Sequence, residues 1–362
     1  MSRTVLLTGA TGFLGMEVLA RLLERDDVEV LALVRGRDAD EARTRLDGVL
    51  DTLYDTRPPG AAERVRAVPG DMIANGLGLS DADRRDVLSR VDSVLHCAAS
   101  ISFDLPLDEA RDINSTGTMR VLDIARELDS LKRVVHVSTA YVSGRHVGRF
   151  GESDLDVGQE FRNTYERSKY ETELMLRAEA GDLPLAIARP SIVVGESVTG
   201  WTPAFNVIYW PLQAFDRGLF DRIPASPDGR VDIVPVDYVA DALVHLLDHD
   251  EVRDTLNLVA GDGAATNEQV LNMAAQHLGR PRPRLVDPGE TPELEEAEVY
   301  IPYFDVRTEF DDRRAQEVLA PHGIRAPALD AYFGPLLDYA RTARWGRRSV
   351  TREGAASALS AA

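Results

Sequence analysis

Short runs of apolar residues alternate, along the first two-thirds of the chain, with longer stretches in which apolar positions recur at helical spacing. Several of the short runs are apolar throughout, as expected of strands that are covered on both faces of a sheet. This pattern predicts strands at 4–8, 29–34, 65–68, 93–97, 134–138 and 185–189. It predicts helices at 13–24, 38–54, 81–88, 113–128 and 165–180. Alternation of this kind predicts an α/β fold with a doubly wound parallel sheet.

The pattern loosens after residue 190. The following forty residues are rich in glycine and proline and are interpreted as loops with one apolar helix. A strand at 231–234 and a helix at 239–247 are predicted to return to the core, with a further strand at 256–259. We assign residues 1–190 and about 230–260 to a main domain and residues 191–230 and 261–345 to a smaller C-terminal substrate-binding cap. Residues 349–362, which end in small side chains, are expected to be a disordered tail.

Three glycines, Gly9, Gly12 and Gly15, follow the first predicted strand in the sequence TGATGFLG. The first permits a tight turn, the second lets backbone approach a pyrophosphate, and the third lets the helix pack closely on the strand. The helix N-terminus adds free N–H groups and the positive end of its dipole. The motif predicts a dinucleotide-binding domain of the Rossmann type. The residues assigned to its phosphate loop are Thr8, Gly9, Thr11, Gly12, Phe13, Leu14 and Gly15.

Arg35 ends the second predicted strand, where NAD-binding domains carry an acidic residue for the ribose 2′-hydroxyl. A carboxylate repels a 2′-phosphate, whereas a guanidinium pairs with it through two hydrogen bonds. We therefore predict NADPH as the cofactor, with a solvent-exposed surface arginine as the alternative. After the third strand, Asp71 with Met72 is predicted to lie at the adenine, although Pro-Gly-Asp is also a common turn.

Tyr165 and Lys169 form a Tyr-x-x-x-Lys motif that places both side chains on one helix face. A phenol has a pKa near 10, and a nearby ammonium favours the phenolate, which eases proton transfer at neutral pH. Thr139 follows the fifth strand at the ligand crevice and is predicted to bond a carbonyl oxygen beside Tyr165. For Asn114 two interpretations stay open, a relay to Lys169 through water or a helix N-cap.

These motifs resemble the extended short-chain dehydrogenases/reductases over residues 3–260. HCAASISFDLPLDEARDINSTGT at 96–118 and the RPSIV segment within 183–201 resemble more narrowly the fatty acyl-CoA reductases and thioester reductase domains. The resemblance implies that Thr139, Tyr165 and Lys169 are catalytic and that Lys169 also binds the nicotinamide ribose. The further cofactor contacts that it implies are Ala98, Ala99, Pro190, Ser191 and Ile192.

The resemblance implies NADPH-dependent reduction of an acyl thioester, carried by CoA or by an acyl carrier protein, to an aldehyde and, with a second hydride, to an alcohol. Nucleotide-sugar epimerases or dehydratases and hydroxysteroid-type dehydrogenases share the Thr-Tyr-Lys set and remain alternatives. A non-catalytic NADPH-binding protein is a third, less favoured because it does not need Tyr165 and Lys169. Residues 262–362 do not match the long helical C-terminal domain of the eukaryotic acyl-CoA reductases.

Composition excludes several other classes. The 362 residues hold 41 Lys+Arg against 60 Asp+Glu, and a net charge of −19 repels phosphate backbones, so no nucleic-acid partner is expected. The single cysteine excludes an intrachain disulfide framework and a multi-cysteine metal site, which fits a reducing, cytoplasmic compartment. We expect no signal peptide and no transmembrane segment, because no apolar stretch reaches the ~18 residues of a span.

Three features leave more than one interpretation. The aromatic-rich segment 201–215 fits an acyl channel, a peripheral membrane contact or a core helix of the cap. Five arginines between 341 and 352 fit either a site for CoA or phosphopantetheine phosphates or the solvated end of a helix. His245 and His249 lie four residues apart without the glutamate of a zinc-protease helix or a third ligand, so no metal site is expected. The oligomeric state stays open.

Overall fold

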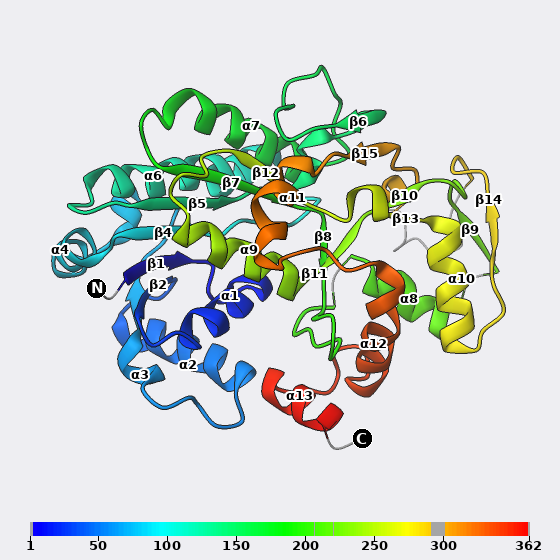
Figure 1. The fold of residues 1–362 in the computed structure, drawn as a ribbon, viewed down its shortest axis with the longest axis horizontal. Helices are drawn as coiled ribbons and strands as arrows, with labels where there is room; N and C mark the ends of the chain where they lie inside the picture. The colour runs from blue at the N-terminus through cyan, green and yellow to red at the C-terminus, as the bar shows by residue number, and fades with distance from the viewer. Residues whose placement is uncertain (1–2, 206, 220, 291–300, 361–362) are drawn as a thin grey trace.

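The computed structural model describes residues 3–205, 207–219, 221–290 and 301–360. Its main domain is built on a seven-stranded parallel sheet in the order β12-β7-β5-β4-β1-β2-β3 (Figure 1). The strands are β1 (Arg3–Thr8), β2 (Val28–Val34), β3 (Val65–Pro69), β4 (Ser93–His96), β5 (Arg133–Val137), β7 (Leu185–Pro190) and β12 (Thr255–Leu258). The predicted α/β class and doubly wound sheet are confirmed, and the strand predicted at 256–259 is β12, at the edge.

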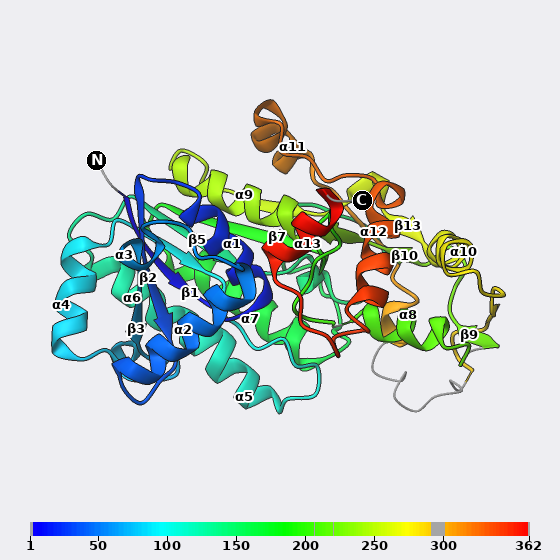
Figure 2. The ribbon, with the colours of Figure 1, turned by 90° about the horizontal axis from the view of Figure 1, so that it is seen from below.

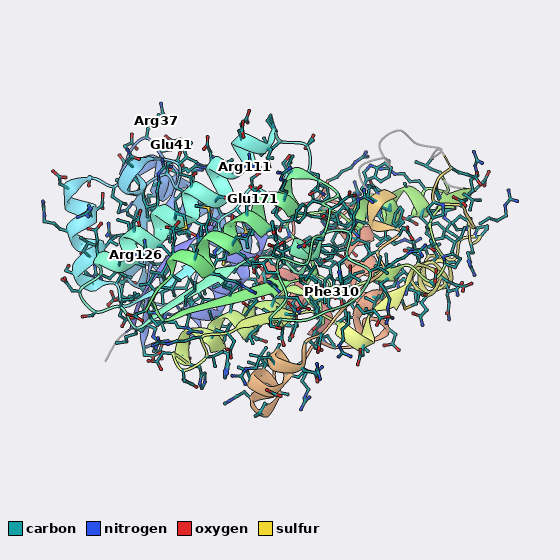
Figure 3. The ribbon with its side chains drawn as sticks, turned by 90° about the horizontal axis from the view of Figure 1, so that it is seen from above. Arg37, Glu41, Arg111, Arg126, Glu171 and Phe310 are labelled. Carbon is teal, nitrogen blue, oxygen red and sulfur yellow. The ribbon has the colours of Figure 1, made fainter. Side chains whose placement is uncertain are left out.

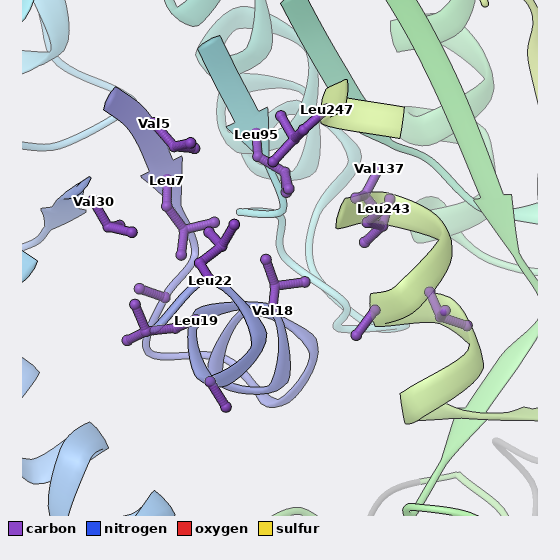
Figure 4. Close-up of a cluster of buried hydrophobic side chains, with 14 of the residues drawn as sticks. Val5, Leu7, Val18, Leu19, Leu22, Val30, Leu95, Val137, Leu243 and Leu247 are labelled. Carbon is purple, nitrogen blue, oxygen red and sulfur yellow. The ribbon is translucent and has the colours of Figure 1, made fainter. Parts of the chain in front are cut away.

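Helices cover both faces of this sheet and bury each strand on two sides. Val5 and Leu7 of β1 face one helical layer, whereas Leu6 between them faces the other. Figure 4 shows the first layer, where Leu22 of α1 and Leu243 of α9 belong to the same apolar cluster as Leu7. The first layer consists of α1 (Phe13–Leu23), α2 (Ala39–Leu53) and α9 (Val236–Asp248), and the second of α4 (Asp81–Arg90), α6 (Gly117–Glu127) and α7 (Thr164–Glu179).

The cap lies beside one end of the main domain and has an apolar core of its own (Figures 1 and 2). Its helices are α8 (Tyr209–Asp216), α10 (Asn267–Leu278) and α12 (Leu329–Thr342). Short strands pair as β8 (Ile192–Val194) with β11 (Ile233–Pro235), β9 (Arg222–Pro224) with β14 (Arg284–Val286), β10 (Arg230–Val231) with β13 (Ala265–Thr266), and β6 (Gly148–Phe150) with β15 (Thr308–Phe310). The remaining helices are α3 (Ala61–Arg64), α5 (Leu107–Arg111), α11 (Arg313–Leu319) and α13 (Arg352–Ser360).

The strand predicted at 231–234 does not return to the main sheet. It is divided into β10 and β11 at Asp232, whose carboxylate accepts the backbone N–H groups of Ala260 and Gly261 at 2.9 and 3.0 Å. The two short strands pair outside the main sheet, β10 with β13 and β11 with β8. The helix predicted at 239–247 does return, as α9. Within the described residues, no helix is long and apolar enough to cross a membrane.

The expected disordered tail is instead folded back onto the main domain through α13, with residues 361–362 outside the described chain. Arg352 Nε donates to both carboxylate oxygens of Glu17 on α1 at 3.0 Å, and Glu353 accepts the backbone N–H of Asp55 at 2.8 Å. The Glu17 side chain is fully buried, so its ion pairs offset the desolvation of the carboxylate. The tail is predicted to be disordered from its composition alone, because the residues that hold it, Glu17 and Asp55, are distant in the sequence.

We expect Arg352→Ala to lower the free energy of unfolding by about 1–3 kcal/mol, because buried Glu17 then keeps only Arg21 as an ion-pair partner among the described residues. Urea denaturation measures the loss, and limited proteolysis should cleave the chain near residue 350 sooner than in the unaltered protein. Arg347→Ala, an exposed arginine nearby, is the control. Unchanged stability and protease resistance in Arg352→Ala would show that this pair does not hold α13.

Candidate active site

The loop between β1 and α1 has the shape that a pyrophosphate requires. Gly9 has a φ of +79°, and a Cβ at this position would lie 2.7 Å from the backbone nitrogen of Ala98. A Cβ at Gly15 would lie 2.0 Å from the carbonyl oxygen of Gly9, so α1 packs directly on the turn. Gly12 is exposed, and the nearest atom to a Cβ there is 3.4 Å away. Its outer side is therefore open to a ligand at the helix N-terminus.

A cavity of about 360 Å³ lies over this loop, where the strand order reverses between β1 and β4. We call it the polar cavity, because its wall is more polar than that of the cap cavity described below. Loops that follow β1, β2, β3 and β4 form its walls. The predicted cofactor residues that line it are Thr8, Gly9, Thr11, Gly12, Arg35, Asp71, Met72, Ala98 and Ala99. The predicted cofactor residues outside this lining are Phe13, Leu14, Gly15, Lys169, Pro190, Ser191 and Ile192.

Two arginines stand at the β2 side of this cavity. Arg35 and Arg45 are both exposed and line it, and Arg45 Nη1 donates to the backbone carbonyl of Arg35 at 2.8 Å. Arg45 was not predicted, because it belongs to α2 and reaches the cavity only through the fold. Asp71, which follows the neighbouring strand β3, also lines the cavity and accepts the backbone N–H of Ile73 at 3.1 Å, so its carboxylate supports its own turn.

Thr139 and Tyr165 lie side by side beyond the end of β5. Their hydroxyls lie close together, and Thr139 Oγ1 donates to the carbonyl of Pro190 at 3.4 Å and accepts the N–H of Tyr141 at 3.2 Å. Burial raises the pKa of Tyr165 to about 12, and the neighbouring Thr139 hydroxyl limits the rise. Tyr165 is therefore protonated near pH 7 and available as a proton donor.

Lys169 is buried at the end of β5, where its ammonium is held by the backbone. Its Nζ donates to the carbonyl of Val137 at 2.8 Å and lies 3.4 Å from Nε2 of His136. Burial lowers the pKa of Lys169 to about 8. The ammonium is therefore directed toward the end of β5, and its tuning of the Tyr165 phenol stays a prediction.

Two buried histidines beneath Lys169 were not predicted. His96 and His136 are opposite each other in the β4–β5 register, with ring centroids 5.1 Å apart. Burial lowers the pKa of both, that of His96 to about 3, so both rings are neutral at pH 7. His96 Nδ1 lies 2.6 Å from Thr8 Oγ1, which connects this pair to the phosphate loop. Each histidine follows apolar strand residues, but only the sheet register shows that they meet.

Asn114 is not a helix N-cap. It lies in a π-helical turn, Asp112–Thr116, inside the continuous helical segment that runs from α5 to α6. Its side chain accepts the N–H of Ser100 at 2.8 Å and donates to Ser168 Oγ at 2.9 Å, so it ties the loop after β4 to α7. The relay through water to Lys169 stays a prediction.

The helical segment from α5 to α6 is also joined to α7 at the surface. Arg111 of α5 and Glu171 of α7 form an ion pair with two hydrogen bonds, at 2.7 and 2.8 Å (Figure 3). Beneath it, the side chains of Glu173 and Arg189 form an ion pair with no exposed surface, and Ser138 donates to the same carboxylate. These contacts hold α7 against β5 and β7, and thereby position the residues of its first turns.

A second, apolar cavity of about 80 Å³ lies in the cap. Tyr303 lines it and stacks on Phe103 at 5.3 Å between ring centroids, and Phe103 lies 6.1 Å from Tyr165. An aromatic path therefore leads from the Tyr165 hydroxyl region to the apolar cavity. The residues in and beside α8 that line the cavity are Val207, Ile208, Pro211, Leu212 and Phe215.

The predicted aromatic segment serves both as core and as cavity wall. Trp201 is fully buried in the main core, whereas Phe215 is buried in the core of the cap and lines the cavity. The five arginines between 341 and 352 do not form one continuous basic patch, because two of them form ion pairs with acidic residues. Arg341 pairs with Asp216 at 2.7 Å, and Arg352 pairs with Glu17.

Comparisons with known proteins agree with this architecture. The family model of the male sterility proteins, an NAD-binding family, matches residues 7–243. Human fatty acyl-CoA reductase 2 is 28% identical over 276 residues, which are 67% of this chain and 54% of that protein. The chain therefore spans about half the length of the curated relatives it matches.

Solved structures share the fold across the cap as well. The terminal R domain from the myxalamid PKS-NRPS biosynthetic pathway has a TM-score of 0.81 at 24% identity, covering 96% of this chain and 93% of that one. UDP-glucuronic acid 4-epimerase from Bacillus cereus, in complex with NAD, has a TM-score of 0.69 at 17% identity, covering 94% and 99%. Because both identities are low, these likenesses concern the fold alone, and the fold by itself does not choose between the two classes.

The buried amine of Lys169 should make stability depend on pH. Its pKa is about 8 in the folded protein against an ordinary value of 10.5, so between these values the unfolded chain binds more protons and the free energy of unfolding rises with pH. From pH 8 to pH 10 we expect the unaltered protein to gain about 2–3 kcal/mol relative to Lys169→Met. Urea denaturation at a series of pH values measures the difference.

The other lysine of the chain, Lys132, provides the matched control. Its side chain is half-exposed and pairs with Asp92 at 2.9 Å, so Lys132→Met should show a nearly constant difference over the same range. A constant difference for Lys169→Met as well would contradict a buried, titrating amine at residue 169.

Proposed function

The chain belongs to the male sterility protein family, and from that premise we propose that it is an NADPH-dependent reductase of acyl thioesters, carried by CoA or by a carrier protein. One observation supports this most strongly. The neighbouring hydroxyls of Tyr165 and Thr139 lie next to Pro190 and Phe103, and Phe103 stacks on Tyr303 in the wall of the apolar cavity. Asn114 also ties the helix of Tyr165 to Ser100 in the wall of the polar cavity. Such a place suits a carbonyl that is attached to a hydrocarbon chain.

The residues at the polar cavity fit a nicotinamide dinucleotide. The open side of Gly12 and the N-terminus of α1 suit the diphosphate, and Arg35 with Arg45 suits a 2′-phosphate. Asp71 is proposed to bind the adenine, and the turn from Pro190 to Ile192 is proposed to border the nicotinamide. When bound, the reduced cofactor supplies the hydride.

The protein residues in this proposal bind and polarise the thioester. The hydroxyls of Tyr165 and Thr139 donate hydrogen bonds to the carbonyl oxygen and stabilise the negative charge that develops on it as hydride adds to the carbonyl carbon. Each such donor is worth about 2.7–4 kcal/mol by analogy with oxyanion holes. The tetrahedral oxyanion then re-forms the carbonyl as the C–S bond breaks, which releases a thiolate and an aldehyde.

A second hydride converts the aldehyde to an alcohol if the product stays bound, and the phenol of Tyr165, protonated near pH 7, then gives the alkoxide its proton. Lys169 donates to the carbonyl of Val137 and lies beside the neutral His136. It is therefore proposed to position the end of β5 that leads to Thr139. The apolar cavity in the cap is proposed to take the acyl chain, which is excluded from water by the aromatic path along Phe103 and Tyr303.

Purified protein should oxidise NADPH and release free thiol when given acyl-CoA substrates of graded chain length. We expect Tyr165→Phe and Thr139→Val each to lower kcat/KM by about 10²–10³, with NADPH binding unchanged. Tyr170→Phe, on the same helix, is the matched control and should retain activity. Absence of thiol release with acyl-CoA and carrier-bound acyl groups, together with turnover of sugar nucleotides, would replace this proposal with the epimerase alternative.

The cofactor preference should depend on the arginines at the polar cavity. We expect Arg35→Asp to lower the preference for NADPH over NADH at least tenfold, and Arg45→Ala to lower it less, because each removes a cation beside the proposed 2′-phosphate site. Arg37→Ala is the control, since its guanidinium pairs with Glu41 on the surface at 2.8 Å (Figure 3). Kd values for both cofactors from fluorescence titration give the ratio, and an unchanged ratio in Arg35→Asp would contradict the assignment.

A further inference from the structure

Three of the seven histidines of the chain meet at a surface position remote from the two cavities. His245 lies in the last turn of α9 and His249 is the residue that caps its C-terminus, with ring centroids 4.0 Å apart. His322, in the turn that follows α11, adds a third ring at 4.3 Å from His245 and 5.2 Å from His249. One ring nitrogen from each residue lies within 4.8 Å of the others. The local sequence pattern shows only two of these rings, because His322 comes from a distant segment.

A neighbouring carboxylate orients the ring of His249 for metal binding. Nδ1 of His249 lies 2.8 Å from a carboxylate oxygen of Glu251, which leaves Nε2 as its ligand atom and fixes the tautomer. A carboxylate bonded to the far nitrogen of a histidine is the usual support of a metal-bound imidazole.

We propose that His245, His249 and His322 form a binding site for a divalent transition-metal ion, with Zn²⁺ as the ion that a three-imidazole set with one open position suits best. Zn–N bonds of about 2.0–2.1 Å hold the nitrogens of a tetrahedral site about 3.4 Å apart. The ring nitrogens now lie within 4.8 Å of one another, so shifts of about 1 Å in their positions complete the site. The fourth position is left to water.

The three histidines lie at the amino edge of the sheet, away from the phosphate loop at its carboxyl edge. The last turn of α9 meets the first residue of β1, because Arg3 pairs with Asp248 and donates to the carbonyl of Leu247 at 2.6 Å. The phosphate loop begins at the other end of the same strand, at Thr8. A metal ion here acts as a clip between α9 and the segment after α11, and it takes no part in the proposed reduction because it lies at the opposite edge of the sheet from the phosphate loop.

Untagged, metal-free full-length protein titrated with ZnCl₂ in an isothermal calorimeter tests the site. We expect one ion per chain and a rise in the unfolding temperature when Zn²⁺ is added. Co²⁺ in place of Zn²⁺ should give the visible absorption of a tetrahedral site. His322→Ala should weaken Zn²⁺ binding at least 100-fold, because it removes one of three ligands from an exposed position. His277→Ala, which instead pairs with Asp338, is the matched control and should bind as the unaltered protein does.

Equal Zn²⁺ affinity in His322→Ala and in the unaltered protein would overturn the proposal, as would the absence of stoichiometric binding. NADPH oxidation provides a separate measurement, since a clip remote from the cavities predicts that chelation lowers the unfolding temperature while the initial rate at 25 °C changes less than twofold. Loss of turnover on chelation would overturn the structural role of the ion.

Discussion

The parallel alignment of the main sheet is the constraint on which the site depends. Because its strands run in one direction, their carboxyl ends meet at one edge, and the loops that follow them bring the glycine turn, Arg35, Asp71, Ala98 and Thr139 together. A sheet of this kind is stable only when helices cover both of its faces, which is why β1 is apolar on both sides. The apolar pattern that builds the core therefore also determines where the polar groups converge.

Burial of polar groups gives this edge its electrostatic character. The chain places one of its two lysines under β5, beside two histidines that burial keeps neutral, and anchors the ammonium on a backbone carbonyl. The buried Glu173–Arg189 pair holds α7 in place nearby. Such groups contribute little net stability, because desolvation opposes their attraction, but each fixes the position of its neighbours. Because Tyr165 belongs to the first turn of α7, these contacts also place its hydroxyl next to Thr139.

The C-terminal part of the chain is attached to the main domain at several separate points. It contributes the cap core and the apolar cavity, while α11 packs beside α9 and α13 is paired to Glu17 of α1. Segments that follow residue 300 thus contact both the main domain and the core of the cap rather than forming an independent unit. The cap is held at a defined place beside the carboxyl edge, which keeps its cavity close to Phe103 and Tyr165.

The sequence by itself determined the strands and helices of the main domain, the glycine turn and the one-face placement of Tyr165 and Lys169, since each depends on periodicity or spacing within about twenty residues. It did not determine that Asn114 lies inside a helix, that Lys169 is directed toward Val137, or that Arg45 reaches the cavity. Nor did it show the meeting of His96 with His136, of His322 with α9, or of Arg352 with Glu17. The physical reason is common to these cases. Each depends on a partner from a distant segment or on the direction of a buried side chain, and only the packed tertiary structure decides which groups approach each other.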